Sequence, residues 1–570
     1  MNHRILRGVH FLKLKGSLSE RLKAHYALLK KEIQTGALPA LAKKNEGLIR
    51  RGPGLLQIPL IQNLVVRLYR HTLLPYMGLS LKRELKHAIA EASAAAEIPE
   101  SIFYEGLFQA DAMMLLARTS VMRHLLPDWV TQSHLPGCTS AVVLKNWTQE
   151  KRLLSCRNLD YPIVGPWEAH PTVLFNEPSE PGEIPHWTLT TAGVHFAGVT
   201  AMNLEGLTVF IHAHFGRRIS LKGTPMVFIG DEIMRRAKTL GQAIEIAKKH
   251  QTYSNWSLVI SSAQEQEAIV IEITPNDIQV RSTEEGYISQ TNYFHHPALQ
   301  KEEALISGGY RDDLEGRFCR MRSLLEEHRG ELTARHLIQT LGDHVDPYSQ
   351  SERIFANTIS VTTTVNSAVF DPEQLRFWIS NRLHSPVGLG DFIEVDTKRF
   401  WNTPLQEYES SMEVIPGYQP KHPKLKEAIH AYRSAYCHFH MNTHDANDLG
   451  PALTSLERAA ALYPNDEHLL IQAALIAFKL KQFDKAFAYL TQTLSGSLTL
   501  HTTMVRDLFL ARLHDLRDER SQALELYQKH PCIPEPKLSE AFAHGMEAPY
   551  HPDQTQSLVI DLHFPDVFEY

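Results

Sequence analysis

The chain has 570 residues, of which 43% are hydrophobic and 21% charged, and its formal net charge at pH 7 is −6. These values are typical of a globular protein and exclude collagen-like, coiled-coil and disordered classes, and the negative charge argues against a nucleic-acid-binding protein. The five cysteines are odd in number and widely scattered, which argues against a disulfide scaffold and favours a reducing compartment.

The positive charge is concentrated at the start of the chain. Residues 1–86 hold 17 Lys and Arg against four Asp and Glu, whereas the other 484 residues hold 41 against 60. This asymmetry predicts a basic segment that either pairs with the acidic body or contacts an anionic membrane from its surface. The first residues lack the apolar core of a secretory signal, and no apolar run reaches the ~18 residues of a spanning helix. We therefore expect a cytoplasmic protein.

Residues 1–137 are expected to be a helical N-terminal segment, either a propeptide or an α-subunit. Ser17 and Glu20 have the spacing of a capping box, and apolar residues follow at helical intervals. The stretch 82–96 is rich in alanine, and Pro99 is suited to the first turn of a further helix.

Residues 138–415 are expected to form the catalytic domain, with short strands and helices in a mixed pattern. The clearest strand patterns cover residues 140–144, 186–192, 207–212, 258–262, 268–273 and 358–365. Helices are expected over 231–250 and 314–328. This mixture predicts an α+β protein built from sheets and helices in layers.

Residues 421–530 are expected to be helical again. The segment 452–490 resembles tetratricopeptide repeats, because small residues stand where helices would cross and Pro464 follows one helix. We expect a short repeat array that binds a protein partner, followed by an irregular tail over 531–570.

The chemistry concentrates around Cys138, which stands in Pro-Gly-Cys-Thr-Ser directly before a predicted strand. Arg157 and Asp160 follow 19 and 22 residues later, in Arg-Asn-Leu-Asp-Tyr-Pro. An antiparallel hairpin over 138–162 would return these two residues to the cysteine. A guanidinium and a carboxylate beside a thiol can stabilise a thiolate and orient a base.

These motifs, with the later Thr291-Asn292-Tyr293, resemble those of the N-terminal-nucleophile hydrolases that act on linear amides. That group includes choloylglycine hydrolases, acid ceramidase, N-acylethanolamine acid amidase and isopenicillin-N acyltransferase. The resemblance covers residues 85–390. It implies a four-layer αββα sandwich, no cofactor or metal, and an N-acylated small molecule or lipid as substrate.

The resemblance also implies roles for individual residues. Cleavage before Cys138 would free an α-amino group, with a pKa of about 7.7–8.0, that acts as base for its own thiol. The thiolate would cleave a non-peptide amide through a thioester. Asp160 would hold the α-amino group, Arg157 would shape the local charge, and Asn292 would donate to the oxyanion. Arg317 is the best match for a second arginine of the site, with Arg311 as its competitor.

Two other functions remain as alternatives: an acyltransferase that uses the same site, and an inactive, repeat-containing adaptor. A papain-like protease is disfavoured because no histidine partner is evident. The other four cysteines are interpreted as structural, because no metal-ligand spacing occurs among them. Further polar residues have structural interpretations that compete with a place at the site; they are Asn203, Gly206, His212, His214 and Glu272.

Overall fold

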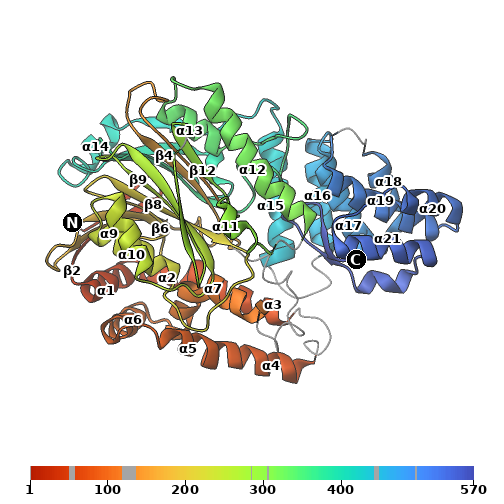
Figure 1. The fold of residues 1–570 in the computed structure, drawn as a ribbon, viewed down its shortest axis with the longest axis horizontal. Coiled ribbons are helices and arrows are strands. Elements are labelled where there is room, and N and C mark those ends of the chain that lie inside the picture. Colours follow the sequence, from red (N-terminus) through yellow and green to blue (C-terminus); the bar gives the residue numbers. More distant parts are fainter. Residues whose placement is uncertain are drawn as a thin grey trace. The chain divides into compact units, whose positions relative to one another are not determined.

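A computed structural model of the chain describes residues 2–50, 58–118, 137–283, 285–304, 307–441, 449–493 and 497–570. They belong to two compact units. The first unit comprises residues 1–304, 321–343 and 363–419, and the second comprises 305–320, 344–362 and 420–570. Figure 1 shows their elements coloured along the sequence. Among the described residues, no helix has both the length and the hydropathy that a membrane span requires.

The first unit contains a nine-stranded sheet in which neighbours are antiparallel, except for the parallel pair β2 and β5. In sheet order its strands are β1 (His3–Leu6), β2 (Val9–Gly16), β5 (Pro171–Pro178), β6 (His186–Thr191), β7 (Thr200–Asn203), β8 (Leu207–His214), β9 (Asn255–Ser262), β10 (Glu267–Ile273) and β11 (Ile278–Ser282). Every residue of β6, β7, β8 and β9 is buried, so both faces of the central sheet are covered.

A second, seven-stranded antiparallel sheet lies in the same unit. In sheet order its strands are β12 (Tyr287–Gln290), β3 (Gly137–Val143), β4 (Leu154–Asp160), β15 (Thr364–Asp371), β16 (Arg376–Ser380), β17 (Asp391–Asp396) and β18 (Val414–Pro416). The chain thus has large sheets combined with many helices, which confirms the expected mixed class. The four-layer sandwich itself stays a prediction.

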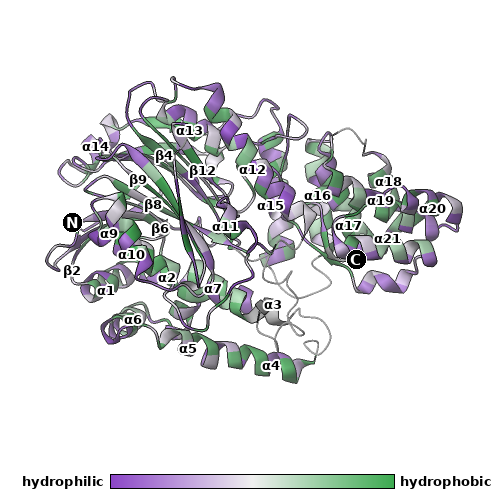
Figure 2. Ribbon diagram, in the orientation of Figure 1, coloured by the Kyte–Doolittle hydropathy of each residue, from purple (hydrophilic) through white to green (hydrophobic). Residues whose placement is uncertain are grey.

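One apolar cluster is shared by the two sheets and contains Phe11, Trp187, Phe210, Phe370 and Phe377. Burial of each such side chain stabilises the fold by about 1.5–3 kcal/mol. A second cluster joins the nine-stranded sheet to helices α9 (Met226–Arg236) and α10 (Leu240–Lys248). In Figure 2 the helices show hydrophobic beside hydrophilic stripes, as expected of helices that bury one face.

Residues 2–16 are not helical, so the expectation for 1–137 is wrong there. Strand β2 pairs with both β1 and β5 because Leu12 and Leu14 alternate with Lys13 and Lys15, which is the period of a strand. The helices begin later, and the capping box of Ser17 and Glu20 starts the first of them as predicted. They are α1 (Leu18–Leu28), α2 (Lys30–Thr35), α3 (Ala37–Arg50), α4 (Pro59–Leu68), the π-helix η2 (Tyr69–Leu73), α5 (Leu74–Gly78), α6 (Arg83–Ala96) and α7 (Glu100–Arg118). Residues 119–136 of the predicted segment lie outside the described residues.

Two further expectations need correction. The helix expected over 231–250 is two helices, because Thr239 accepts a hydrogen bond from the backbone of Gln242 and caps a new start. The strand expected over 358–365 begins only at Thr364. Before it, the Thr358 hydroxyl bonds to the Ser360 carbonyl, a local bond that competes with strand pairing.

The helices of the second unit lie where the sequence places them, in consecutive pairs that pack together. They are α15 (Leu425–Tyr436), the π-helix η5 (Cys437–Met441), α16 (Leu449–Leu462), α17 (Glu467–Lys479), α18 (Phe483–Thr491), α19 (Leu500–Asp515) and α20 (Arg520–Gln528). Their identity as tetratricopeptide repeats stays a prediction. The tail is not irregular throughout, because Pro536 opens helix α21 (Pro536–Glu547) and β19 (Val559–Ile560) pairs with β20 (Val567–Glu569).

The remaining elements are short connections, with one exception. That exception is α12 (Gly308–Glu327), whose residues contribute to both units. The others are α11 (Pro297–Gln300), α13 (Ala334–Leu341), α14 (Leu405–Ser411), the 3₁₀ helices η4 (Val387–Leu389) and η7 (Pro552–Gln556), and the strand pair β13 (Val345–Asp346) and β14 (Ser351–Glu352).

Candidate active site

The predicted hairpin around Cys138 is present as strands β3 and β4. Gly137 pairs with Asp160, Cys138 with Leu159, and Ser140 with Arg157. Because side chains alternate between the two faces of a strand, Cys138 and Arg157 belong to the same face of the sheet. The return strand therefore brings the guanidinium back to the sulfur.

Arg157 contacts the sulfur directly. Its Nη2 lies 3.0 Å from Cys138 Sγ and donates to the Ile211 carbonyl at 2.8 Å, and the thiol also lies 3.4 Å from that carbonyl. Arg157 is 1% exposed, and its Nε and Nη1 have no hydrogen-bond partner among the described residues. A buried guanidinium is unfavourable without an anion beside it, and no described carboxylate forms an ion pair with this one. The guanidinium is therefore in place to stabilise the negative charge of the sulfur once the thiol has lost its proton.

Asn292 lies just beyond β12 and holds the backbone of Cys138. Its Oδ1 accepts a hydrogen bond from Cys138 N at 2.8 Å, and its Nδ2 donates to the Ala213 carbonyl at 3.0 Å. Both residues are buried. Asn292 thus fixes the position of the cysteine nitrogen, which is the group that would become the α-amine. Its role as an oxyanion donor stays a prediction.

Asp160 ends β4 beside the residue that precedes the cysteine. Its Oδ1 accepts a hydrogen bond from the Thr364 hydroxyl at 2.6 Å. A Cβ atom placed on Gly137 would lie 3.0 Å from Asp160 Cβ and 3.2 Å from its Oδ2. A side chain at position 137 would therefore press on the carboxylate, which explains the glycine in Pro-Gly-Cys.

The two candidates for a second arginine, Arg311 and Arg317, both lie in helix α12 within the second unit. The Nε atom of Arg317 donates to Asp313 Oδ2 at 2.9 Å, and Arg317 is buried. The first unit thus brings together four of the five predicted site residues, and the role of Arg317 stays a prediction.

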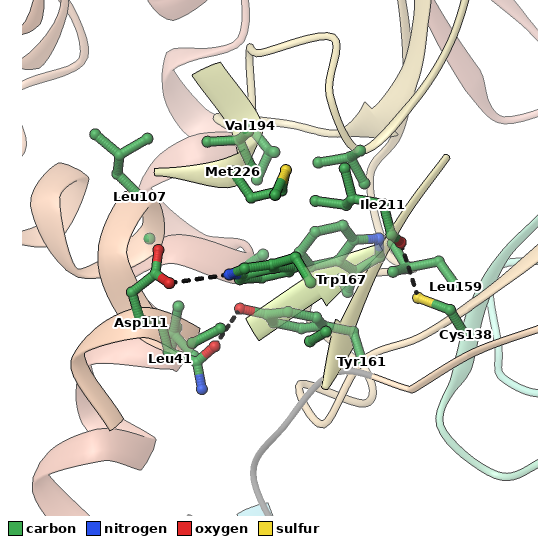
Figure 3. Close-up of a pocket in the computed structure, with 18 of the residues that line it drawn as sticks. Leu41, Leu107, Asp111, Cys138, Leu159, Tyr161, Trp167, Val194, Ile211 and Met226 are labelled. Atoms are coloured by element: carbon green, nitrogen blue, oxygen red, sulfur yellow. Dashed lines mark hydrogen bonds between the residues drawn. The ribbon is translucent and has the colours of Figure 1, made fainter. Parts of the chain in front are cut away.

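Cys138 and Arg157 lie in the wall of a pocket that is partly open to solvent. Figure 3 shows the sulfur at one side, the rings of Tyr161 and Trp167 across the middle, and Asp111 at the opposite side. The remaining lining is predominantly apolar and comes from helices α3, α7 and α9, strands β8 and β9, and the connection between β6 and β7. It includes Leu38, Leu41, Leu107, Ala110, Val194, Val199, Ile211, Met226, Val227 and Trp256. Such a pocket fits an extended apolar group attached to the reacting carbonyl.

Sequence reasoning did not find this lining. Asp111 is its one carboxylate among the described residues, and it is buried in α7 between Ala110 and Ala112. An acidic residue in the middle of an apolar helix is the signal that could have found it. The aromatic residue Trp256 gave no comparable signal.

Three of the residues with competing structural interpretations form hydrogen bonds within the sheets or their turns. Nε2 of His212 bonds to the Ser140 hydroxyl, and Nε2 of His214 bonds to the Ser257 hydroxyl. Asn203 Oδ1 accepts from the backbone of the turn between β7 and β8.

Glu272 and Gly206 also have structural explanations. The Glu272 carboxylate is fully buried and accepts from Arg281 and from the backbone of His295 and His296. Gly206 has φ +82° in a hairpin turn, where a glycine is favoured. These contacts position strands and turns rather than a substrate.

Comparison with known proteins gives a family-model match over residues 147–384, for the family described as acyl-coenzyme A:6-aminopenicillanic acid acyl-transferase. This range is less than half of the chain. It includes Arg157, Asp160, Asn292 and Arg317 but begins after Cys138. The match supports an amide-bond hydrolase or acyltransferase of the N-terminal-nucleophile type.

One similar solved structure is that of a mutant conjugated bile acid hydrolase from Clostridium perfringens. The similarity extends over 50% of this chain and 97% of that chain, with 11% sequence identity and a TM-score of 0.29. At this TM-score the likeness bears no weight for either fold or function. No curated protein matches the chain.

Proposed function

We propose that the protein is a cysteine N-terminal-nucleophile hydrolase that cleaves the linear amide bond of an N-acylated small molecule or lipid. The observation that carries this proposal is the contact of 3.0 Å between Arg157 Nη2 and Cys138 Sγ at the wall of an apolar pocket. A buried cation beside the sulfur supports a nucleophilic thiolate, and the apolar lining supports an acyl chain as the group bound there.

In the proposed reaction, cleavage of the Gly137–Cys138 bond frees the α-amine, which takes the thiol proton. The sulfur attacks the amide carbonyl, and the tetrahedral intermediate collapses to a thioester while the amine leaves with that proton. Water then attacks the thioester, and the acid is released as the thiol is restored. Asp160, beside residue 137, and Asn292, on the cysteine nitrogen, are suited to hold the α-amine in place.

An N-acyl-amide library with liquid chromatography and mass spectrometry of the products tests this proposal. The wild type should release free amine, and Cys138→Ala should release none, because only the sulfur can form the thioester. Cys156→Ala is the matched control. Cys156 is fully buried in β4, and burial raises the pKa of its thiol to about 12. Undiminished release by Cys138→Ala would refute the proposal.

Maturation has its own test. Self-cleavage before Cys138 should give fragments of 137 and 433 residues on a denaturing gel, and Edman sequencing of the larger should begin Cys-Thr-Ser-Ala. A single full-length band that still hydrolyses amides would contradict the α-amine as base.

The second candidate is an acyltransferase, which the description of the matched family favours. The two candidates differ only in what attacks the thioester. If the protein is an acyltransferase, added amines should give a new amide as product without changing the rate at which the thioester forms. If it is a hydrolase, the free acid should stay the product when amines are added. An inactive adaptor would give neither product.

We also propose two binding partners. The helices over 421–530 are the proposed contact with a protein, and residues 1–86 the proposed contact with an anionic membrane. Part of the basic charge is already paired, since Lys13 and Lys15 both contact Glu177. Helix α4, however, exposes Leu60, Leu64 and Leu68 at intervals of four residues, and Leu60 is 79% exposed. An apolar stripe in a basic segment is typical of a helix that lies on a bilayer.

A further inference from the structure

Asp111 is a buried carboxyl group on the side of the pocket opposite Cys138 (Figure 3). It is 2% exposed, and its Oδ1 accepts hydrogen bonds from the Ser254 hydroxyl at 2.5 Å and from Trp256 Nε1 at 3.0 Å. Its Oδ2 has no hydrogen-bond donor among the described residues. The group is therefore held firmly through one oxygen, while the other has no partner from the described part of the protein.

A buried carboxyl oxygen without a hydrogen-bond donor destabilises the fold unless a donor from another molecule reaches it. A buried carboxylate without a full set of donors loses its hydration, and this burial raises the pKa of Asp111 to about 6. No cation offsets the loss, because no ion pair forms between Asp111 and a described residue. Leu41, Leu107 and Ala110 of the pocket lining have no side-chain donor, and the Tyr161 hydroxyl of the same pocket donates to Gln109 Oε1 instead. A donor from a bound molecule would supply the missing contact.

We propose that Asp111 forms a polar subsite that binds a hydrogen-bond donor, a hydroxyl or an ammonium group, carried by the acyl chain at a distance from the scissile amide. This rests on the proposed function, since it takes the acyl chain to occupy the pocket. The preferred substrate is then an amide whose acyl chain is apolar along its length and polar at its far part. Asp111 is a specificity-determining residue, remote from the reacting atoms.

A structural role is the competing explanation, because Asp111 links α7 to the start of β9 through Ser254 and Trp256. The two explanations differ in what Asp111→Asn would do. Asparagine keeps Oδ1 as the acceptor for both donors and replaces Oδ2 with an NH₂ group. A structural link would survive this change, whereas a subsite for donors would lose its acceptor.

The test uses N-acyl-aminomethylcoumarins with six-, eight- and ten-carbon chains, each in a plain, a terminal-hydroxyl and a terminal-amino form. For at least one length, wild type should favour a donor-bearing form in kcat/KM by roughly tenfold to a hundredfold, as expected for a hydrogen bond to a charged acceptor. Asp111→Asn should reduce this ratio to about one or below and retain turnover of the plain chain. Tyr161→Phe removes a hydroxyl from the same pocket and should leave the ratio unchanged.

Two results would overturn the inference. One is a kcat/KM ratio of donor-bearing to plain substrate near one at every chain length in wild type. The other is an equal loss of kcat/KM for all three substrate forms in Asp111→Asn. Calorimetric binding of octanoic, 8-hydroxyoctanoic and 8-aminooctanoic acids to Cys138→Ala separates this inference from the proposed function. The subsite is upheld, even if no amide is hydrolysed, when the hydroxy and amino acids bind more tightly than octanoic acid and the double variant Cys138→Ala, Asp111→Asn loses this preference. Equal binding of the three acids would reject it.

Discussion

Replacement of Asp111 by Asn should change how the stability of the first unit depends on pH. Burial raises the pKa of Asp111 from 3.8 to about 6. The neutral form is therefore favoured in the folded state, and its stabilising effect is fully present below pH 3.8 and is lost as the pH rises through 6. The difference of about two pKa units corresponds to about 3 kcal/mol of unfolding free energy. Roughly 1.3 kcal/mol of this stabilisation is lost between pH 5 and pH 7.

The variant has no carboxyl group at this position, so its stability should lack this contribution. As the pH rises, the unfolding free energy of wild type should therefore fall relative to that of Asp111→Asn. Tyr161 in the pocket lining and Tyr253, which precedes Ser254 in the chain, do not titrate in this range, because burial raises their pKa values above 10.

Tryptophan fluorescence in urea is the suitable assay, because the six tryptophans that the structure describes all belong to the first unit. Curves measured at half-unit steps from pH 5 to 7 give the two free energies. Glu100→Gln is the control, since it removes one carboxylate from the exposed start of the same helix. Parallel pH profiles for Asp111→Asn and wild type would refute the reasoning.

Further substitutions probe the cysteine and the proposed membrane contact. Arg157→Lys should lower turnover at least about tenfold and slow iodoacetamide labelling of Cys138, because an ammonium cannot reach both the sulfur and the Ile211 carbonyl in the same geometry; unchanged labelling would contradict the role of the guanidinium. Asn292→Ala should lower kcat by about 10² to 10³, with a smaller effect on KM, because it removes the predicted oxyanion donor together with the contact to Cys138 N. An effect on KM alone would contradict its place beside the nucleophile. Leu64→Asp should reduce flotation with vesicles of anionic lipid but not with neutral ones, and equal flotation of wild type and variant at low salt would exclude α4 as the contact.

The sequence was informative where structure is local. The hairpin of β3 and β4 could be predicted because a strand pattern after Cys138 and the polar motif at Arg157 are close in the chain, and antiparallel pairing follows from a short connection. The capping box at Ser17 and the helix boundary at Pro464 were likewise readable from a few neighbouring residues.

The pocket could not be predicted, because its walls come from segments that are far apart in the sequence. Helices α3 and α7 precede the cysteine and β8, α9 and β9 follow it, so the lining depends on how these elements pack. The N-terminal hairpin was missed for a related reason: β2 is fixed in the nine-stranded sheet by parallel pairing with β5, more than 150 residues later. The alternation in β2 covers only its second half, because its first four residues are all buried, and so short a pattern is a weak signal by itself.

The central claim, that Cys138 carries the acyl group, is most directly tested by peptide mass mapping of enzyme quenched in acid during turnover of an N-acyl amide. The proposal predicts that the mass of the acyl group is added to the peptide containing Cys138, that hydroxylamine removes it, and that it is absent from Cys138→Ala. An adduct on another residue, or amide hydrolysis with no adduct and no loss on substitution of Cys138, would contradict it.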